Sequence, residues 1–459
     1  MPLALSAVLS YAPQNASNMK LLSFFFAAAL GVLPRLHAAD SQSAVRARVD
    51  AELPRLLDLY KHLHANPEIS FQEAQTAARI ADELKQAGFT VTTQVGGHGV
   101  VGVLKNGAGP TVLVRTDLDG LPVLEETGLP YASKTRTKDD KGIDVPTMHA
   151  CAHDIHMSSF IGTARVLAAL RDQWSGTLVF IGQPAEERVG GAKGMLAAGL
   201  YTRFPRPDFC LALHAASDLP AGVVGHTEGY ALANADTVDI TVRGVSGHGA
   251  WPHTTKDPIV LSAQIILGLQ TIVSRETSPT DPAVVTVGSI HGGTKHNIIP
   301  DEVRLQLTLR SYSDEVRDAS IAALKRIVRG QALAAGIPEK LLPVVEVSEE
   351  GAKSTYNDPA LNKRVTGAIG RWLGEGNIVA KKPVMGAEDF GLFGRTEPRI
   401  PICMFWLGTI TKESVTESIK TGKTLPSLHS SKFAPVPEPT LKTGVTAMSA
   451  AVLELVGKK

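Results

Sequence analysis

The chain contains little cysteine, few aromatic residues and almost no excess of charge of either sign. Its 459 residues include three cysteines, 5% aromatic residues and a net charge of +1. Three cysteines without regular spacing do not predict a disulfide framework, and we expect Cys210 and Cys403, which lie in apolar runs, to be buried free thiols; the alternative is one disulfide in an exported protein. A near-neutral balance leaves no basic excess to displace counterions, so the composition argues against a nucleic-acid partner.

Long apolar runs are also rare. The run at residues 21–33 (LLSFFFAAALGVL) follows a short positive region that begins at Met19, and it is shorter than a comfortable bilayer span. We therefore expect residues 1–39 to be a signal peptide that is cleaved near Ala38 or Ala39, with an upstream start extension before Met19. The protein would then be exported to the periplasm or secreted, with no membrane span in its mature form. The alternative is an uncleaved anchor.

The remaining sequence has an ordinary globular composition, 44% hydrophobic and 20% charged, with room for two or three domains. Several short apolar runs are continuous rather than alternating, which is typical of strands buried on both faces of a helix-covered, largely parallel sheet. These runs lie at 100–104, 111–115, 177–181, 209–213 and 402–407. Helical patterns at 45–64, 73–87 and 158–170 accompany them. The sequence therefore predicts an α/β fold.

A different pattern occupies the middle of the chain. Alternating strands are predicted at 237–243, 284–290 and 303–310, with helices at 258–274 and 316–333 between and after them. This order indicates a small α+β domain inserted into the α/β domain. We expect a catalytic domain in two parts, an inserted lid or dimerisation domain between them, and boundaries as follows: 40–229, 230–341 and 342–459.

Five residues form a set of potential metal ligands: Cys151, His153, Glu187, His214 and His429. The thiol and the first imidazole lie two residues apart in MHACAHDIH, and the carboxylate belongs to a Glu-Glu pair in GQPAEE. Such a set suits a two-metal hydrolytic site, and Glu186 remains as a base. The alternatives are a buried structural cysteine and a solvated acidic turn.

Eight motifs in order carry a resemblance to a known family: RTDLDGLP, MHACAHDIH, GQPAEE, LHA, SGHGAWPH, GGTKHNIIPD, GAEDF and LHSSKF. Over residues 50–440 the chain resembles the hippurate hydrolase, N-acyl-amino-acid amidohydrolase and auxin-conjugate hydrolase group of the aminoacylase and carboxypeptidase G superfamily. The resemblance implies a zinc-peptidase-like catalytic domain with two divalent metal ions. It assigns the five ligands named above to these ions and the role of general base to Glu186.

The resemblance also implies roles outside the ligand set. Asp119 would orient a ligand imidazole. His248 and Asn297 would cross a homodimer interface formed by the lid into the partner's site, where His248 would stabilise the oxyanion. Asn297 and Arg310 would bind the free carboxylate of the substrate, and Gly386 would form part of the pocket wall. The alternatives are a surface histidine at 248 and a solvated strand-end cation at 310.

One position departs from the family pattern inside a ligand motif. Ala152 lies between Cys151 and His153, where the family usually has glycine. A methyl group there would press on the backbone if the position has positive φ.

Taken together, these features predict an exported amidohydrolase. It would cleave N-acyl or aryl-acyl amino acids, small-molecule substrates, to a carboxylic acid and a free amino acid. Thiolate and imidazole ligands favour zinc, while carboxylate and imidazole also suit manganese. The alternatives are a dipeptidase or carboxypeptidase on the same scaffold, a catalytically silent binding protein, and a metal-stabilised structural protein.

Overall fold

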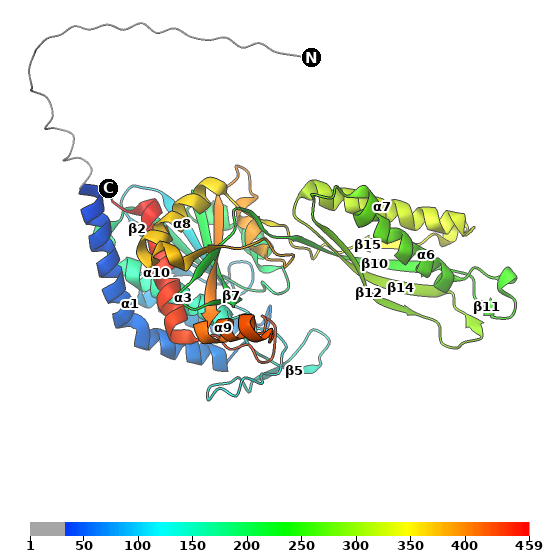
Figure 1. Cartoon of the computed structure of the whole chain (residues 1–459), viewed down its shortest axis with the longest axis horizontal. Coiled ribbons are helices and arrows are strands. Elements are labelled where there is room, and N and C mark those ends of the chain that lie inside the picture. The colour runs from blue at the N-terminus through cyan, green and yellow to red at the C-terminus, as the bar shows by residue number, and fades with distance from the viewer. Residues whose placement is uncertain (1–32, 459) are drawn as a thin grey trace, which may run out of the picture.

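The computed structural model describes residues 33–458, so most of the predicted signal peptide lies outside the described residues. Figure 1 shows two bodies joined by a narrow connection: a large α/β domain and a smaller domain made from the middle of the chain. The first described helix is longer than predicted, because it begins at residue 33 rather than 45; it is α1 (Leu33–Ala65).

The large domain is built on an eight-stranded sheet within residues 33–458. Its four central strands are mutually parallel, which confirms the predicted largely parallel sheet, while the flanking strands pair antiparallel except at the far edge. In sheet order the strands are β1 (Thr90–Thr92), β2 (Val100–Asn106), β6 (Gly176–Gln183), β3 (Thr111–Asp117), β7 (Phe209–Pro220), β18 (Ile402–Ile410), β8 (Val224–His226) and β17 (Ile378–Ala380).

Helices cover both faces of this sheet, and each face has its own apolar core. One face packs against α1 and four other helices: α2 (Ala74–Gln86), α3 (His153–Ala169), α8 (Pro359–Leu373) and α10 (Pro437–Val456). The other face packs against shorter elements: α4 (Gly191–Ala197), α5 (Leu200–Arg203) and the 3-10 segment η6 (Asp389–Gly394). Peripheral elements are α9 (Lys412–Thr421) and the β4–β5 hairpin (Arg136–Lys138, Asp144–Pro146).

The smaller domain, which we call the lid, is a four-stranded antiparallel sheet with two helices against one face. Its strands are β12 (Ala283–Gly292), β14 (Glu302–Ser311), β10 (Asn234–Arg243) and β15 (Val344–Val347), and its helices are α6 (Pro258–Thr271) and α7 (Asp314–Ala334). Strand β15 pairs with β10, so the lid sheet continues past residue 341. The short pair β11 (Gly247–His248) and β13 (Ile298–Ile299) forms its tip (Figure 1).

Two strands connect the bodies: β9 (Gly229–Leu232) and β16 (Thr355–Asn357) form an antiparallel pair at the hinge. The side chain of Asn234 links three segments at this connection. It donates to the backbone carbonyls of Tyr312 and Ser313 and accepts from the backbone N–H of Ser354. Within residues 33–458, one helical stretch, Pro258–Glu276, is long and apolar enough to cross a membrane by length and composition; it packs on the lid sheet with 33% of its most apolar window buried.

Candidate metal centre

The candidate metal centre lies where the parallel strands of the large sheet end. Strands β3 and β6 finish level with each other at Asp117 and Gln183, and β7 carries His214. The first residue of α3 is His153, and α3 packs against β3 and β7. Open α/β sheets place their sites at this carboxyl edge, so the topology collects ligands from distant segments.

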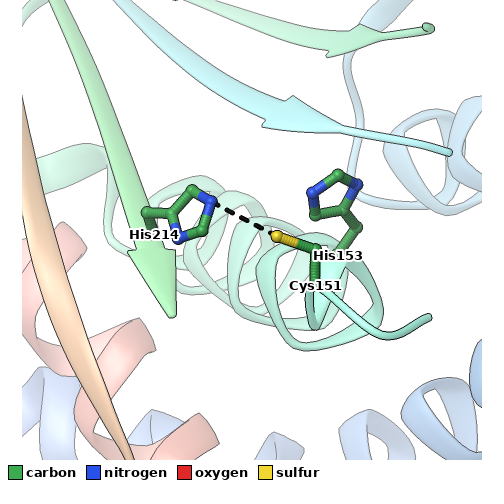
Figure 2. A group of neighbouring side chains, drawn as sticks. All are labelled: Cys151, His153 and His214. Atoms are coloured by element: carbon green, nitrogen blue, oxygen red, sulfur yellow. Dashed lines mark hydrogen bonds between the residues drawn. The ribbon is translucent and has the colours of Figure 1, made fainter. Parts of the chain in front are cut away.

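Three of the five predicted ligands form the inner part of the site (Figure 2). Cys151 precedes α3, His153 begins it, and His214 faces both from β7. The Sγ atom of Cys151 lies 3.7 Å from Nε2 of His214, and one ligand atom from each of the three residues lies within 4.8 Å of the others. All three side chains are buried. Their soft, converging donor set is one that divalent zinc accepts.

The other two predicted ligands complete the cluster. Oε1 of Glu187 lies 3.4 Å from Nε2 of His429 and 3.9 Å from Nε2 of His153. Cys151, Glu187 and His429 also form a group whose ligand atoms lie within 4.8 Å of one another. The His429 side chain is 53% exposed, unlike the rest. The five side chains therefore form one continuous cluster that opens to solvent on the His429 side.

The cluster fits positive ions. Nε2 of His153 and Oε1 of Glu187 are buried without a hydrogen-bond partner among the described residues. Burial, Glu187 and Glu186 raise the pKa of the Cys151 thiol, and a bound cation reverses that direction. Six carboxylates lie at the centre and, in the described part of the chain, only one guanidinium pairs with any of them: Arg115 binds Asp117, Glu388 and Asp389, while Asp119, Glu186 and Glu187 lie beside His153. Bound divalent cations would balance this excess of negative charge.

Glu186 lies beside the ligands, in a turn rather than in a strand. Its Oε2 is 3.8 Å from Nε2 of His153. The preceding Ala185 has φ 48°, and this turn after β6 lets two consecutive carboxylates face one site, as a straight strand would not. Burial, together with Glu388 and Glu187, raises the pKa of Glu186. A carboxyl group in such surroundings suits proton transfer near neutral pH.

Asp119 contacts both halves of the ligand set. Its backbone carbonyl accepts from Nδ1 of His153 at 2.7 Å, and its Oδ1 lies 3.4 Å from the same nitrogen. The other oxygen, Oδ2, accepts from Ser70 Oγ at 2.6 Å and from the Glu187 backbone N–H at 3.0 Å. The contact predicted to orient a ligand imidazole is thus made most closely by the backbone, while the carboxylate holds the Glu187 turn.

A buried network of hydrogen-bonded and charged side chains lies next to the site, and the sequence did not predict it. Arg115 donates to Gln183 at 2.9 Å, to Asp117 at 2.7 Å and to Glu388 at 2.8 Å. Gln183 in turn donates to Asp389 at 2.6 Å. These bonds join β3, β6 and the start of η6. They lie beside Glu186, because ligand atoms of Glu186, Glu388 and Asp389 are within 4.8 Å of one another. The motif RTDLDG contains both Arg115 and Asp117, but nothing in it indicates that Gln183 and Glu388, 68 and 273 positions away, are also partners of Arg115.

His156 joins this network as a neutral imidazole. Its Nδ1 bonds to Oδ1 of Asp117 at 2.7 Å, and its Nε2 accepts from the Ala215 backbone N–H at 2.8 Å. Burial lowers the pKa of His156 to about 4, which agrees with one donating and one accepting nitrogen. The ring therefore holds the residue that follows His214, and the structure gives it a positioning role.

A second buried histidine lies under the start of α3. His64, at the end of α1, bonds to Asp154 at 2.6 Å and to Glu125 at 3.0 Å, and all three side chains are almost wholly buried. Burial alone would lower the pKa of His64, but the hydrogen bonds to the two carboxylates outweigh it and raise the pKa to about 10. The sequence showed His64 only as the end of a helix.

Three residues at the centre adopt left-handed backbone conformations that side chains other than glycine rarely take. They are Ala152 (φ 63°), Ala185 (φ 48°) and His429 (φ 67°). Ala152 therefore has the positive φ at which a methyl group was expected to press on the backbone, and its side chain is fully buried. Backbone strain of this kind gathers at functional sites because it aims side chains.

The predicted substrate-binding residues and the predicted oxyanion residue His248 divide into two groups. Arg310 and Gly386 line a cavity of about 620 Å³ that also borders Glu186. His248 and Asn297 lie at the lid tip, exposed, and are not among the residues that line this cavity. One chain therefore does not bring these two residues to its own metal centre, and their action in a partner's site stays a prediction.

The fold and the centre define a hydrolase with a two-metal site at the edge of an α/β sheet. Residues 113–452 match the model of the Peptidase family M20/M25/M40, and the chain belongs to that family. It is 35% identical to N-acetylcysteine deacetylase of Bacillus subtilis (77% of this chain, 88% of that protein) and 35% identical to thermostable carboxypeptidase 2 of Saccharolobus solfataricus (88% and 96%).

A solved structure shares both the fold and the metal chemistry. The Bacillus subtilis YXEP protein, described as a dinuclear metal binding peptidase from the M20 family, superposes with a TM-score of 0.70 at 30% identity, covering 88% of this chain and 99% of that one. The predicted family, fold class and enzyme class, a metal-dependent hydrolase, are confirmed by these likenesses.

Proposed function

We propose that the protein hydrolyses the amide bond of N-acyl amino acids and releases a carboxylic acid and a free amino acid. The observation that carries this proposal is the buried carboxyl of Glu186, 3.8 Å from a ligand imidazole and on the wall of a cavity of about 620 Å³. The cation of Arg310 on the same wall suits a substrate with a free carboxylate. The relative that deacetylates N-acetylcysteine supports the substrate class.

The mechanism assigns proton transfer to Glu186. The five predicted ligands would hold two divalent cations, which would supply an activated water and polarise the scissile carbonyl. Glu186 takes the proton from the attacking water and delivers it to the departing amide nitrogen, so that the amine leaves neutral. Arg310, which lines the same cavity, fixes the amino-acid end. Asp119 holds the first imidazole and the Glu187 turn at their spacing.

We propose zinc or manganese as the metal. The thiolate of Cys151 with three imidazoles favours zinc, and the carboxylate of Glu187 also accepts manganese. Metal analysis of the purified protein, with Cys151→Ala as comparison, tests the ligand set. Loss of bound metal in the variant is expected, and full occupancy of both sites would remove Cys151 from it.

We propose that two copies pair through the lid and that the His248 of each acts in the site of the other. Helix α6 turns the apolar side chains of Ile259, Val260 and Leu267 to solvent, and β12 is an open sheet edge. Exposed apolar surface beside an unpaired strand is typical of an interface. Light scattering of the purified protein should give the mass of a dimer, and a monomer at all concentrations would contradict this proposal.

We also propose export, because the apolar run at 21–33 has the length and flanks of a signal-peptide core. Cell fractionation with sequencing of the mature N-terminus tests it: a chain that begins near Asp40 outside the cytoplasm supports cleavage. A chain that still begins at residue 1 or 19 would contradict it.

The experiment that tests the reaction measures amino-acid release from N-acetyl, N-benzoyl and longer N-acyl amino acids and from free dipeptides. Turnover of the blocked substrates is expected. Turnover of dipeptides alone would favour the second candidate, a carboxypeptidase or dipeptidase, which the similarity to a thermostable carboxypeptidase supports. Turnover of neither would contradict both.

A further inference from the structure

A charged corner of the cavity has no part in the mechanism above. Lys381, Asp218 and Trp406 all line the same cavity as Glu186. Nζ of Lys381 lies 2.6 Å from each carboxylate oxygen of Asp218 and 5.5 Å from the centre of the Trp406 ring. The other neighbour of this indole is the ligand His214, with ring centres 5.5 Å apart. The indole ring of Trp406 therefore lies between the Lys381 ammonium and the predicted ligand His214.

Lys381 is held in place along its whole length. Its backbone N–H donates to the carbonyl of His226 at 2.7 Å, and its carbonyl accepts from the Thr227 hydroxyl at 3.1 Å. The aliphatic stem packs over Gly225, where an added Cβ would come within 2.8 Å of the lysine Cδ. The side chain is 14% exposed. A lysine fixed in this way presents its charge at a defined point, unlike a free surface lysine.

The hydrogen bonds of this ammonium are incomplete. An ammonium has three N–H donors, and within residues 33–458 the bonds of Nζ go to the two oxygens of Asp218 alone. Asp218 is 67% exposed and remains hydrated. At least one donor of Lys381 is therefore left to water in the empty cavity. A substrate that expels this water leaves the donor unpaired unless the substrate carries an acceptor.

The position of Lys381 indicates which part of the substrate it meets. Arg310, on the lid strand β14, is the cation suited to the carboxylate of the amino acid. Lys381 and Trp406 belong to the large domain, where Lys381 follows β17 and Trp406 lies on β18 beside β7. With the scissile bond at the metal centre and the amino-acid carboxylate at Arg310, the acyl group is the part of the substrate left to reach Lys381.

We infer that the pinned Lys381 makes the acyl pocket selective for acyl groups that carry an acceptor oxygen, a carboxylate above all, over alkyl groups of the same length. This inference rests on the proposed function. The charge of Lys381 makes a carboxylate the strongest acceptor, and the exposed carboxylate of Asp218 is the group with which the substrate competes. Polar sites that lose a hydrogen bond reject the substrate that lacks it more strongly than apolar sites reject a missing methylene.

The experiment compares two substrates that differ at one end. N-succinyl and N-butyryl derivatives of one amino acid have acyl chains of four carbons, and only the first ends in a carboxylate. We measure kcat/KM for both with the wild type, Lys381→Met, Asp218→Asn and the control Lys382→Met. Lys382 is the exposed neighbour and does not line the cavity, so the control makes the same chemical change outside it.

The wild type is expected to prefer the succinyl substrate. Lys381→Met should lower the succinyl-to-butyryl ratio of kcat/KM about 10- to 100-fold, mainly through KM, because the methionine keeps the stem and removes the donor. Asp218→Asn should raise the ratio, and Lys382→Met should leave it as in the wild type. Equal ratios in the wild type and Lys381→Met would overturn the inference while leaving the proposed function in place. Failure to hydrolyse any N-acyl amino acid would overturn both.

Discussion

The ligand cluster of the large domain and the tip of the lid differ in how far one chain completes them. The five ligand candidates converge, and buried hydrogen bonds from Asp119 and Arg115 hold their surroundings. His248 belongs to β11 at the outer end of the lid (Figure 1), Asn297 directly precedes β13, which pairs with β11, and both residues are exposed. The difference predicts that one chain brings all its ligand candidates together, whereas turnover would need His248 from the second copy proposed above.

The largest loss of activity should come from a change beside the ligand cluster of the large domain. Glu186→Gln keeps the shape of the side chain and removes the base, so kcat should fall by at least about 10²- to 10⁴-fold. Metal content should stay at the wild-type level, because the five ligands are unchanged. Turnover close to the wild type would remove Glu186 as the base, and loss of metal would make it a ligand instead.

The second-largest loss of activity should come from the lid tip, and it tests whether the tip acts in the site of the other copy. His248→Ala should lower kcat about 10²- to 10³-fold, as expected for one lost oxyanion donor, with normal metal content. Refolding this variant together with Glu186→Gln tests the interface. In a mixed dimer one of the two sites has both residues, so about a quarter of the wild-type activity should return. No recovery would place His248 in the site of its own chain.

A pH titration of stability examines the buried part of the large domain. The pKa of His64 is raised to about 10 in the folded chain, above the ordinary value of 6.5. A raised pKa means that the imidazolium contributes stability fully below pH 6.5 and loses this contribution as the pH rises through about 10. The free energy of unfolding should therefore fall across this window, and His64→Gln should flatten the slope. The same slope in both proteins would contradict the role of His64.

The smallest effect concerns the backbone of the ligand motif. Ala152 has φ 63°, and glycine adopts this conformation without strain. Ala152→Gly should therefore raise the free energy of unfolding by about 0.5–1 kcal/mol, measured by denaturant titration of the metal-free protein. Ala169→Gly, at the end of α3, is the matched control and should lower it. A loss of stability in Ala152→Gly would show that the methyl packing outweighs the strain.

The sequence was most informative where a function needs reactive side chains in short motifs. Cys151 and His153 share one motif, and strand ends placed the other ligands, so the converging set could be predicted. The partners of Arg115 and His64 could not, because Glu388 lies 273 positions from Arg115 and Asp154 lies 90 positions from His64. An isolated arginine or histidine in a sequence looks the same whether it is solvated or paired in the core.

The lid shows the same limit for secondary structure. Its long alternating strands were predicted, whereas β15 is a run of four residues, VVEV, whose strand character comes from pairing with β10. The tip strands β11 and β13 are two residues each and depend likewise on their partner. Pairing between short segments is a tertiary effect, so a local pattern carries little of it.

Strand β18 sits inside the large sheet between β7 and β8, although it is synthesised after the whole lid. A hydrogen bond from Thr409 to Ala216 joins positions 193 residues apart, and the ligand His429 follows later still. A growing chain therefore carries an open sheet and an incomplete metal shell until its last segments emerge. We therefore expect metal uptake late in folding, after His429 has emerged, and C-terminally truncated chains should neither bind their full complement of metal nor bury their core.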